Sequence, residues 1–163
     1  MEPIGVLPLQ IALMKLEEEL SFLRHAAFNI PPNLSQNEVY KLLHKGIGIL
    51  KLGSQIFDFL ENVENGDPLL KENAISSLFE AVFIVSTLFK NLKPYTPLFW
   101  EDITVFTEPV LLKLEQLNKT LYDYLDTSTQ DIDYGELGFV LDEIAKTLEA
   151  ALLLSRKIHS LTL

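Results

Sequence analysis

The stretch SQNEVYKLLHKGIGILKLGSQIFDFLENVE, residues 35–64, decides the fold class of this 163-residue chain. Ser35 followed three residues later by Glu38 is a capping box, the pattern that begins a helix. From there to about Glu64, apolar residues and glycines recur at alternating steps of three and four, the spacing of one packed helix face. These positions are Val39, Leu42, Gly46, Ile49, Gly53, Ile56, Leu60 and Val63. The stretch therefore predicts one long amphipathic helix.

Two glycines of this stretch, Gly46 and Gly53, share one position of the seven-residue repeat. A glycine in an exposed helix costs about 1 kcal/mol relative to alanine. On a packed face, however, it removes the side chain that holds a neighbouring backbone away, so we expect Gly46 and Gly53 to form a close helix contact. Gly48 lies outside this stripe, and the sequence offers no role for it. A phosphate-binding loop at these glycines is excluded because no strand precedes them.

Similar apolar periodicity appears in four further segments, which polar or proline-containing stretches separate. They run from about 7 to 28, from 68 to about 92, from 97 to about 126 and from 133 to about 160. Helices that short connections join lie antiparallel to one another. The sequence therefore predicts an all-α, single-domain, up-and-down antiparallel helical bundle of four to five helices over residues 1–163. Pro109 lies inside the fourth segment, where we expect the helix to be kinked or broken.

The composition excludes several classes of protein. The chain has no cysteine, which excludes disulfides, thiolate metal sites and a cysteine nucleophile. Its net charge of −10 has the wrong sign for binding nucleic acid or an anionic membrane surface. The longest uncharged stretch of the most apolar segment is 81–89, far shorter than the roughly 20 residues that span a bilayer. No secretory signal is recognisable. We therefore expect a soluble, cytoplasmic protein that binds neither nucleic acid nor a membrane.

The polar residues form no recognisable catalytic, cofactor-binding or metal-binding motif. None of His25, His44 and His159 follows a Glu by three residues, as the di-iron bundle proteins require. The acids of residues 131–136 lack the spacing and the final bidentate Glu of a calcium loop. Glu80, in the apolar third segment, is either a buried acid with a chemical role or the mark of an exposed strip on that helix. We expect no enzymatic activity, no metal and no cofactor.

Negative charge is concentrated in residues 101–149. This region holds twelve of the 23 acidic residues and three of the 13 Lys and Arg residues, so that it accounts for −9 of the total −10. An acidic surface attracts basic partners over a long range and speeds their association, but it is also an ordinary means of staying soluble. The candidate partner face comprises Asp123, Asp126, Asp131, Asp133, Glu136, Asp142 and Glu143.

Two functions are consistent with these features. The first is a non-catalytic helical interaction or regulatory protein that binds a basic protein through its acidic face. It would also self-associate through the apolar third segment or the glycine stripe. The alternative is a bundle that holds a small apolar ligand between its helices, in an aromatic-lined pocket. The candidate pocket residues are Phe79, Phe83, Phe99, Trp100 and Phe106.

Overall fold

The computed structural model describes the backbone of residues 6–62, 68–95, 97–127 and 132–162, and the side chains of residues 6–62, 69–95, 107–126 and 132–157. Within these ranges the chain forms five α-helices, one short 3-10 turn and no strand. The helices are α1 (Val6–Phe28), α2 (Gln36–Asn62), α3 (Pro68–Leu92), α4 (Pro97–Thr127) and α5 (Tyr134–Thr162), and the turn Lys93–Tyr95 follows α3. The all-α prediction is confirmed.

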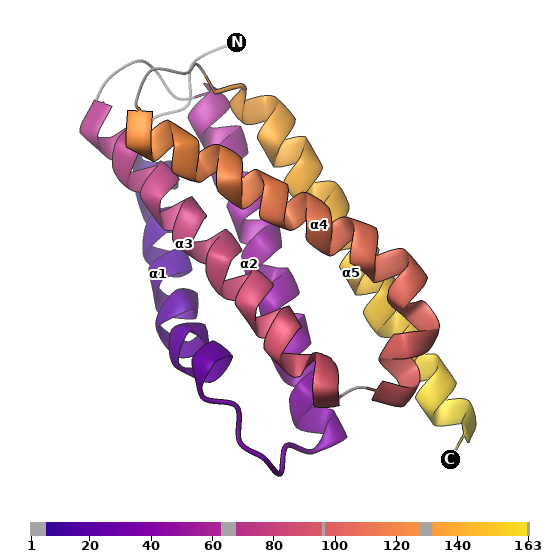
Figure 1. Cartoon of the computed structure of the whole chain (residues 1–163). Helices are drawn as coiled ribbons and strands as arrows, with labels where there is room; N and C mark the ends of the chain where they lie inside the picture. Colours follow the sequence, from indigo (N-terminus) through magenta and orange to yellow (C-terminus); the bar gives the residue numbers. More distant parts are fainter. Residues whose placement is uncertain (1–5, 63–67, 96, 128–131, 163) are drawn as a thin grey trace.

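Consecutive helices run in opposite directions, as the up-and-down prediction requires (Figure 1). α2, α3, α4 and α5 form a ring in which each helix contacts the next and α5 contacts α2 again. α1 lies outside this ring and packs against α2 and α3. The carboxyl ends of α2 and α4 and the amino ends of α3 and α5 therefore lie together at one end of the bundle (Figure 1).

Side-chain caps mark the starts of α2 and α5. Ser35 Oγ accepts a hydrogen bond from the backbone N–H of Glu38 at 3.2 Å, and Asp133 Oδ1 accepts one from the N–H of Glu136 at 3.1 Å. The first N–H groups of a helix have no partner within it, so such caps stabilise the helix by about 1 kcal/mol. The capping box at Ser35 thus begins α2 where the sequence indicates.

One cluster of buried apolar side chains fills the bundle and includes residues of all five helices. α4 contributes the seam Val110, Leu114, Leu117 and Leu121. Because α4 is continuous through Pro109, the helix is not broken there, and a kink at this residue stays a prediction.

The glycines of α2 lie where neighbouring helices come close. A Cβ added to Gly46 would lie 3.3 Å from Leu88 Cδ2 of α3. One added to Gly53 would lie 3.0 Å from Leu141 Cδ2 of α5. Both distances are tighter than ordinary side-chain contact, so the stripe places α2 against two helices rather than one. Gly48 has open space around it.

A further close contact comes from α5, at a glycine that the sequence pattern did not single out. A Cβ on Gly138 would lie 3.0 Å from Phe57 Cβ and 3.3 Å from the backbone oxygen of Ser54. Ser54 Oγ donates a hydrogen bond to the Gly138 carbonyl at 2.7 Å. The signal was present in the sequence, because Gly138 lies on the buried seam of α5. That seam comprises Gly138, Leu141, Ala145, Leu148 and Leu152.

α3 is the most apolar of the five helices. Among the residues that the structure describes, Leu69–Tyr95 is the one helical stretch long and apolar enough to cross a membrane by length and composition. Half of its most apolar window is buried inside the bundle, however. The core helix of a soluble bundle has the same properties, so this feature alone is weak evidence for a membrane span.

Candidate functional site

Opposite charges gather at the two ends of the bundle. What we call the acidic end comprises Asp58 and Glu61 of α2, Asp123 and Asp126 of α4, and Asp133 and Glu136 at the start of α5. The basic end comprises Lys41 and Lys45 of α2, Lys90 of α3, Lys93 just after α3, and Arg156 and Lys157 of α5. Lys71 in the first turn of α3 and Glu38 in the first turn of α2 are exceptions to this pattern. The fold thus turns a sequence whose excess of acids lies mainly in residues 101–149 into a molecule with two differently charged ends.

Two carboxylates of the acidic end serve the helix that starts there. Glu61 Oε2 accepts a hydrogen bond from the N–H of Gly135 at 2.8 Å, and Asp133 caps the same helix. Carboxylates at the amino end of a helix are favoured by the positive end of its dipole. The charges of Glu61 and Asp133 therefore have a structural role in starting α5.

Asp58 and Asp126 occupy the opposite electrostatic situation. They lie near the carboxyl ends of α2 and α4, where the helix dipole is negative and a carboxylate costs about 0.3–1 kcal/mol. Neither helix has a basic residue in its last turn. Both side chains are exposed, and no ion pair is found for either among the described residues. The stability of its own helix therefore gives no reason for either charge. Asp58 Oδ1, however, also lies close to the first turns of α5, because a Cβ added to Gly138 would lie 3.2 Å from it, and the dipole of α5 is positive at that end.

The predicted partner face is only partly brought together. Asp123, Asp126, Asp133 and Glu136 lie at the acidic end, whereas Asp131 lies outside the described residues. Asp142 lies farther along α5 and pairs with Lys146 at 2.8 Å. The hydrogen bond to Asp142, helped by its charge, raises the pKa of Lys146. Glu143 lines a groove between α4 and α5.

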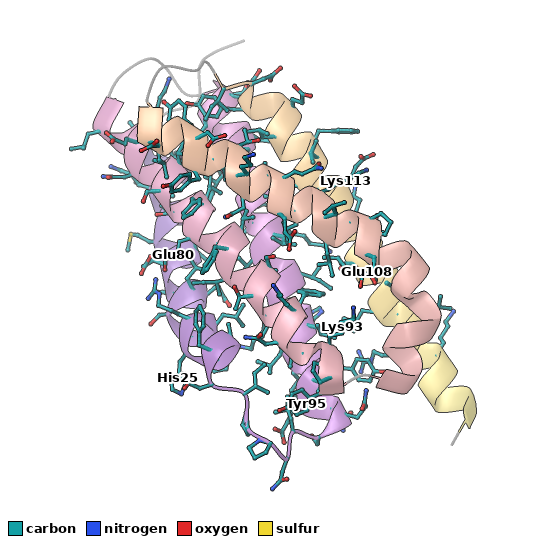
Figure 2. The ribbon with its side chains drawn as sticks, in the orientation of Figure 1. His25, Glu80, Lys93, Tyr95, Glu108 and Lys113 are labelled. Atoms are coloured by element: carbon teal, nitrogen blue, oxygen red, sulfur yellow. The ribbon has the colours of Figure 1, made fainter. Side chains whose placement is uncertain are left out.

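Other acids of residues 101–149 are neutralised along the sides of the bundle. Glu108 of α4 pairs with Lys93 at 2.7 Å, and Figure 2 shows the two side chains side by side between α3 and α4. Glu149 of α5 pairs with Lys51 of α2. Sequence analysis missed Asp58 and Glu61, although acids near the end of a helix without a basic residue were a usable signal.

Comparison with known proteins places the chain in a family. A family model described as "Uncharacterized protein" matches residues 9–161. The chain belongs to this family. A relative from Aquifex aeolicus (strain VF5), also described as "Uncharacterized protein", is 31% identical over 157 residues, which cover 93% of this chain and 94% of the relative. No solved structure matches the chain. The residues of this chain that the family model matches include parts of all five helices.

Phe79 and Phe83, two of the predicted pocket residues, lie on the outer side of α3. Their rings stack at a centroid distance of 6.4 Å. Phe28 of α1 lies 6.5 Å from the Phe83 ring, and Tyr122 of α4 lies 5.9 Å from the Phe79 ring. These four residues form a row across three helices, which we call the aromatic row. The side chains of the other three predicted pocket residues, Phe99, Trp100 and Phe106, lie outside the described residues.

An open groove of about 590 Å³ runs between α4 and α5. Its floor is apolar, and polar side chains line its edges. The floor comprises Val110, Leu117, Leu137, Val140 and Ile144, and the edges comprise Lys113, Gln116, Thr120, Glu143, Lys146 and Thr147. The sequence did not indicate this groove, because it depends on how far apart α4 and α5 lie.

Glu80 is a partly exposed ion-pair partner rather than a buried acid. It lies on the α1 side of α3 (Figure 2), where Arg24 Nε donates a hydrogen bond to its Oε1 at 2.7 Å. The Glu80 side chain is 39% exposed. Hydrogen bonds to Glu80 and then Glu17 raise the pKa of Arg24. In the part of the chain that the structure describes, no group of three or more His, Asp or Glu side chains lies close enough to hold a metal ion.

Proposed function

We propose that this protein is a non-catalytic helical interaction protein whose acidic end binds a basic protein partner. The observation that supports this most is the position of Asp58 and Asp126 near the negative ends of two helices, neither of which has a basic residue in its last turn. An acid kept only for solubility has the same effect anywhere on the surface. At these positions it also weakens its own helix, and a cationic partner would offset that cost.

The physical basis of recognition is long-range attraction. An acidic end of six carboxylates steers a basic surface toward it and raises the association rate more than the final affinity. Because the charges are exposed, ions in solution screen them, and the Debye length falls from about 10 Å at 0.1 M salt to about 3 Å at 1 M. Partner binding is therefore expected to weaken strongly as salt increases.

The test compares two variants that remove the same amount of charge. Asp58→Asn/Asp126→Asn neutralises two acids of the acidic end that do not cap α5 and that lie near the negative ends of their own helices. Glu18→Gln/Glu115→Gln neutralises two exposed acids on the sides of the bundle and serves as the control. Tagged proteins are used to capture partners from a native lysate at low and high salt, followed by quantitative mass spectrometry.

We expect the wild type and Glu18→Gln/Glu115→Gln to capture the same basic proteins in equal amounts at low salt. Asp58→Asn/Asp126→Asn is expected to lose these proteins, and so is the wild type at high salt. Equal capture by all three proteins, or capture that does not depend on salt, would contradict the proposal. Lysate capture also reveals whether the basic partner is the basic end of another copy, since that copy would carry the chain's own sequence without the tag.

A second candidate function rests on the groove between α4 and α5. Its volume of about 590 Å³ lies within the range of small-molecule sites, and its apolar floor with polar edges is typical of them. In this alternative the bundle holds a small apolar ligand. Native mass spectrometry of the purified protein is expected to show the mass of the chain plus that of a retained ligand. Val140→Trp fills the groove, so this variant is expected to show no retained ligand. A bare chain mass for both proteins would contradict this alternative.

A further inference from the structure

The outer side of α3 remains uncovered after α1, α2 and α4 have packed against it. Phe83 there is 46% exposed, and Phe28 and Tyr122, on either side of it, are each 55% exposed. An aromatic side chain buries about 150–250 Å² when fully covered, so the aromatic row leaves on the order of 400 Å² of apolar surface in water. A stable protein interface buries about 800 Å² on each partner. The row is therefore large enough to be the centre of an interface.

The sequence of this outer side has a symmetric pattern. Glu72, Phe79, Phe83 and Lys90 follow one another at steps of seven, four and seven, so the spacing is the same in both directions. Seven and four are the steps of a helix-packing seam. Glu72 and Lys90 are 18 residues apart, which is about five turns of 3.6 residues, so both charges lie on one line with the two rings between them.

The charges of this pattern select one arrangement of two such helices. When a second α3 lies antiparallel across the first, Glu72 of each copy faces Lys90 of the other, and Phe79 faces Phe83. When it lies parallel, Glu72 faces Glu72 and Lys90 faces Lys90, which is repulsive. Both side chains are exposed, and no ion pair within the chain is found for either in the described residues.

We propose that the outer side of α3 binds a second copy of this chain, in a two-fold symmetric dimer with the two α3 helices antiparallel. A two-fold interface requires a surface that is complementary to itself, and the pattern from Glu72 to Lys90 has this property. The two ion pairs lie about 13 Å on either side of the symmetry axis. At the shallow crossing angle of about 20°, helices diverge there by only about 5 Å, which Glu and Lys side chains span.

This interface does not depend on the acidic end, so the dimer and the proposed function are separable. Asp58→Asn/Asp126→Asn is expected to remain dimeric. Phe83→Glu is expected to dimerise more weakly while it still captures a basic partner. Either proposal therefore survives the failure of the other.

The first test measures mass by light scattering and sedimentation from low to high micromolar concentration. The wild type is expected at twice the chain mass of 18.5 kDa. Phe83→Glu places a charge at the centre of the interface and is expected to weaken dimerisation about tenfold or more. Leu112→Glu changes an apolar residue of α4 outside the row that is even more exposed than Phe83, and it is expected to leave the dimer intact. A wild type that stays monomeric throughout would overturn the proposal.

Charge reversal tests the antiparallel arrangement itself. Glu72→Lys alone and Lys90→Glu alone each create two like-charge contacts and are expected to weaken the dimer, whereas the double variant restores opposite charges and is expected to recover it. Since the chain has no cysteine, Glu72→Cys and Lys90→Cys copies supply a second measurement. On oxidation they are expected to cross-link when mixed but not separately. Dimer affinity that does not change with these charge reversals, or equal cross-linking in the unmixed samples, would refute this interface.

Discussion

α2 and α3 each pack against three other helices, yet only α3 leaves large apolar side chains exposed. The exposed positions of α2 are polar residues and Gly48, whereas those of α3 include Leu69 and Phe83. Both helices have long buried faces, so the difference is not in the strength of the core. The comparison shows that the other helices of the chain cover the large apolar side chains of α2, whereas α3 keeps apolar side chains that its three neighbours leave exposed.

The largest expected effect compares one phenylalanine from each helix. Phe57 of α2 is fully buried, so Phe57→Ala is expected to lower the free energy of unfolding by about 3–5 kcal/mol through lost burial and the cavity left behind. Phe83→Ala on α3 is expected to cost less than about 1.5 kcal/mol in the monomer, because almost half of the ring is already in water. Urea titrations at a concentration where both variants are monomeric measure the difference. Equal losses of unfolding free energy in the two variants would contradict the difference in burial between Phe57 of α2 and Phe83 of α3.

The next effect concerns glycine. Gly138→Ala pushes a methyl group against Phe57 Cβ and the backbone of Ser54, and is expected to cost about 1–3 kcal/mol through overpacking between α2 and α5. Gly48→Ala is the matched control, because the same change in open space is expected to stabilise α2 by up to about 1 kcal/mol. Thermal unfolding of both variants should show opposite shifts in Tm. Two shifts of the same sign would mean that α2 and α5 are not closely packed.

A smaller effect separates a buried hydrogen bond from an exposed one. Ser54→Ala removes the buried bond from Ser54 Oγ to the Gly138 carbonyl and is expected to cost about 1 kcal/mol. Thr87 Oγ1 of α3 makes a similar bond to the Phe83 carbonyl at 2.9 Å, but this bond is exposed, and Thr87→Ala is expected to be nearly neutral. Double-variant measurements with Gly138→Ala would sharpen the comparison, since only Ser54→Ala is expected to couple to it.

The smallest effect is at the ion pair between α1 and α3. Glu80→Gln is expected to cost less than about 1 kcal/mol, because partly exposed pairs are screened by water. Because the ion pair raises the pKa of Arg24, the contribution of the pair is complete below the ordinary pKa of arginine and is lost only as the pH rises beyond it. The difference in the free energy of unfolding between the wild type and Glu80→Gln should therefore stay constant from pH 6 to pH 9. A large loss of stability in this variant would instead identify Glu80 as part of a buried site.

The sequence predicted those features of the fold that depend on neighbouring residues along the chain. The capping box at Ser35 placed the start of α2, and the three-and-four spacing of apolar residues identified the five helices. It did not predict the close contact at Gly138, because that contact depends on Ser54 and Phe57 of α2, about 80 positions away in the chain. The groove between α4 and α5 had no signal at all, since it is a space between two helices.

The candidate sites show the same division. The sequence indicated Phe79 and Phe83 as pocket residues, in the alternative in which aromatic side chains line a ligand pocket between the helices. Sequence analysis had no means of adding Phe28 and Tyr122, which come from helices far away in the chain. It found the excess of acids in residues 101–149 but not that Glu108 and Glu149 are paired with lysines of other helices, or that Asp58 and Glu61 join the acidic end.

The chain alone thus specifies that this protein is a bundle of long antiparallel helices with a glycine stripe on the second, because helix formation and apolar periodicity are local properties set by residues a few positions apart. The packing of the helices decides which residues share a surface, and so creates both the acidic end and the aromatic row. Those features bring together residues separated by tens of positions. Their proximity follows from the total burial of all five helices at once, and no single segment contains that information.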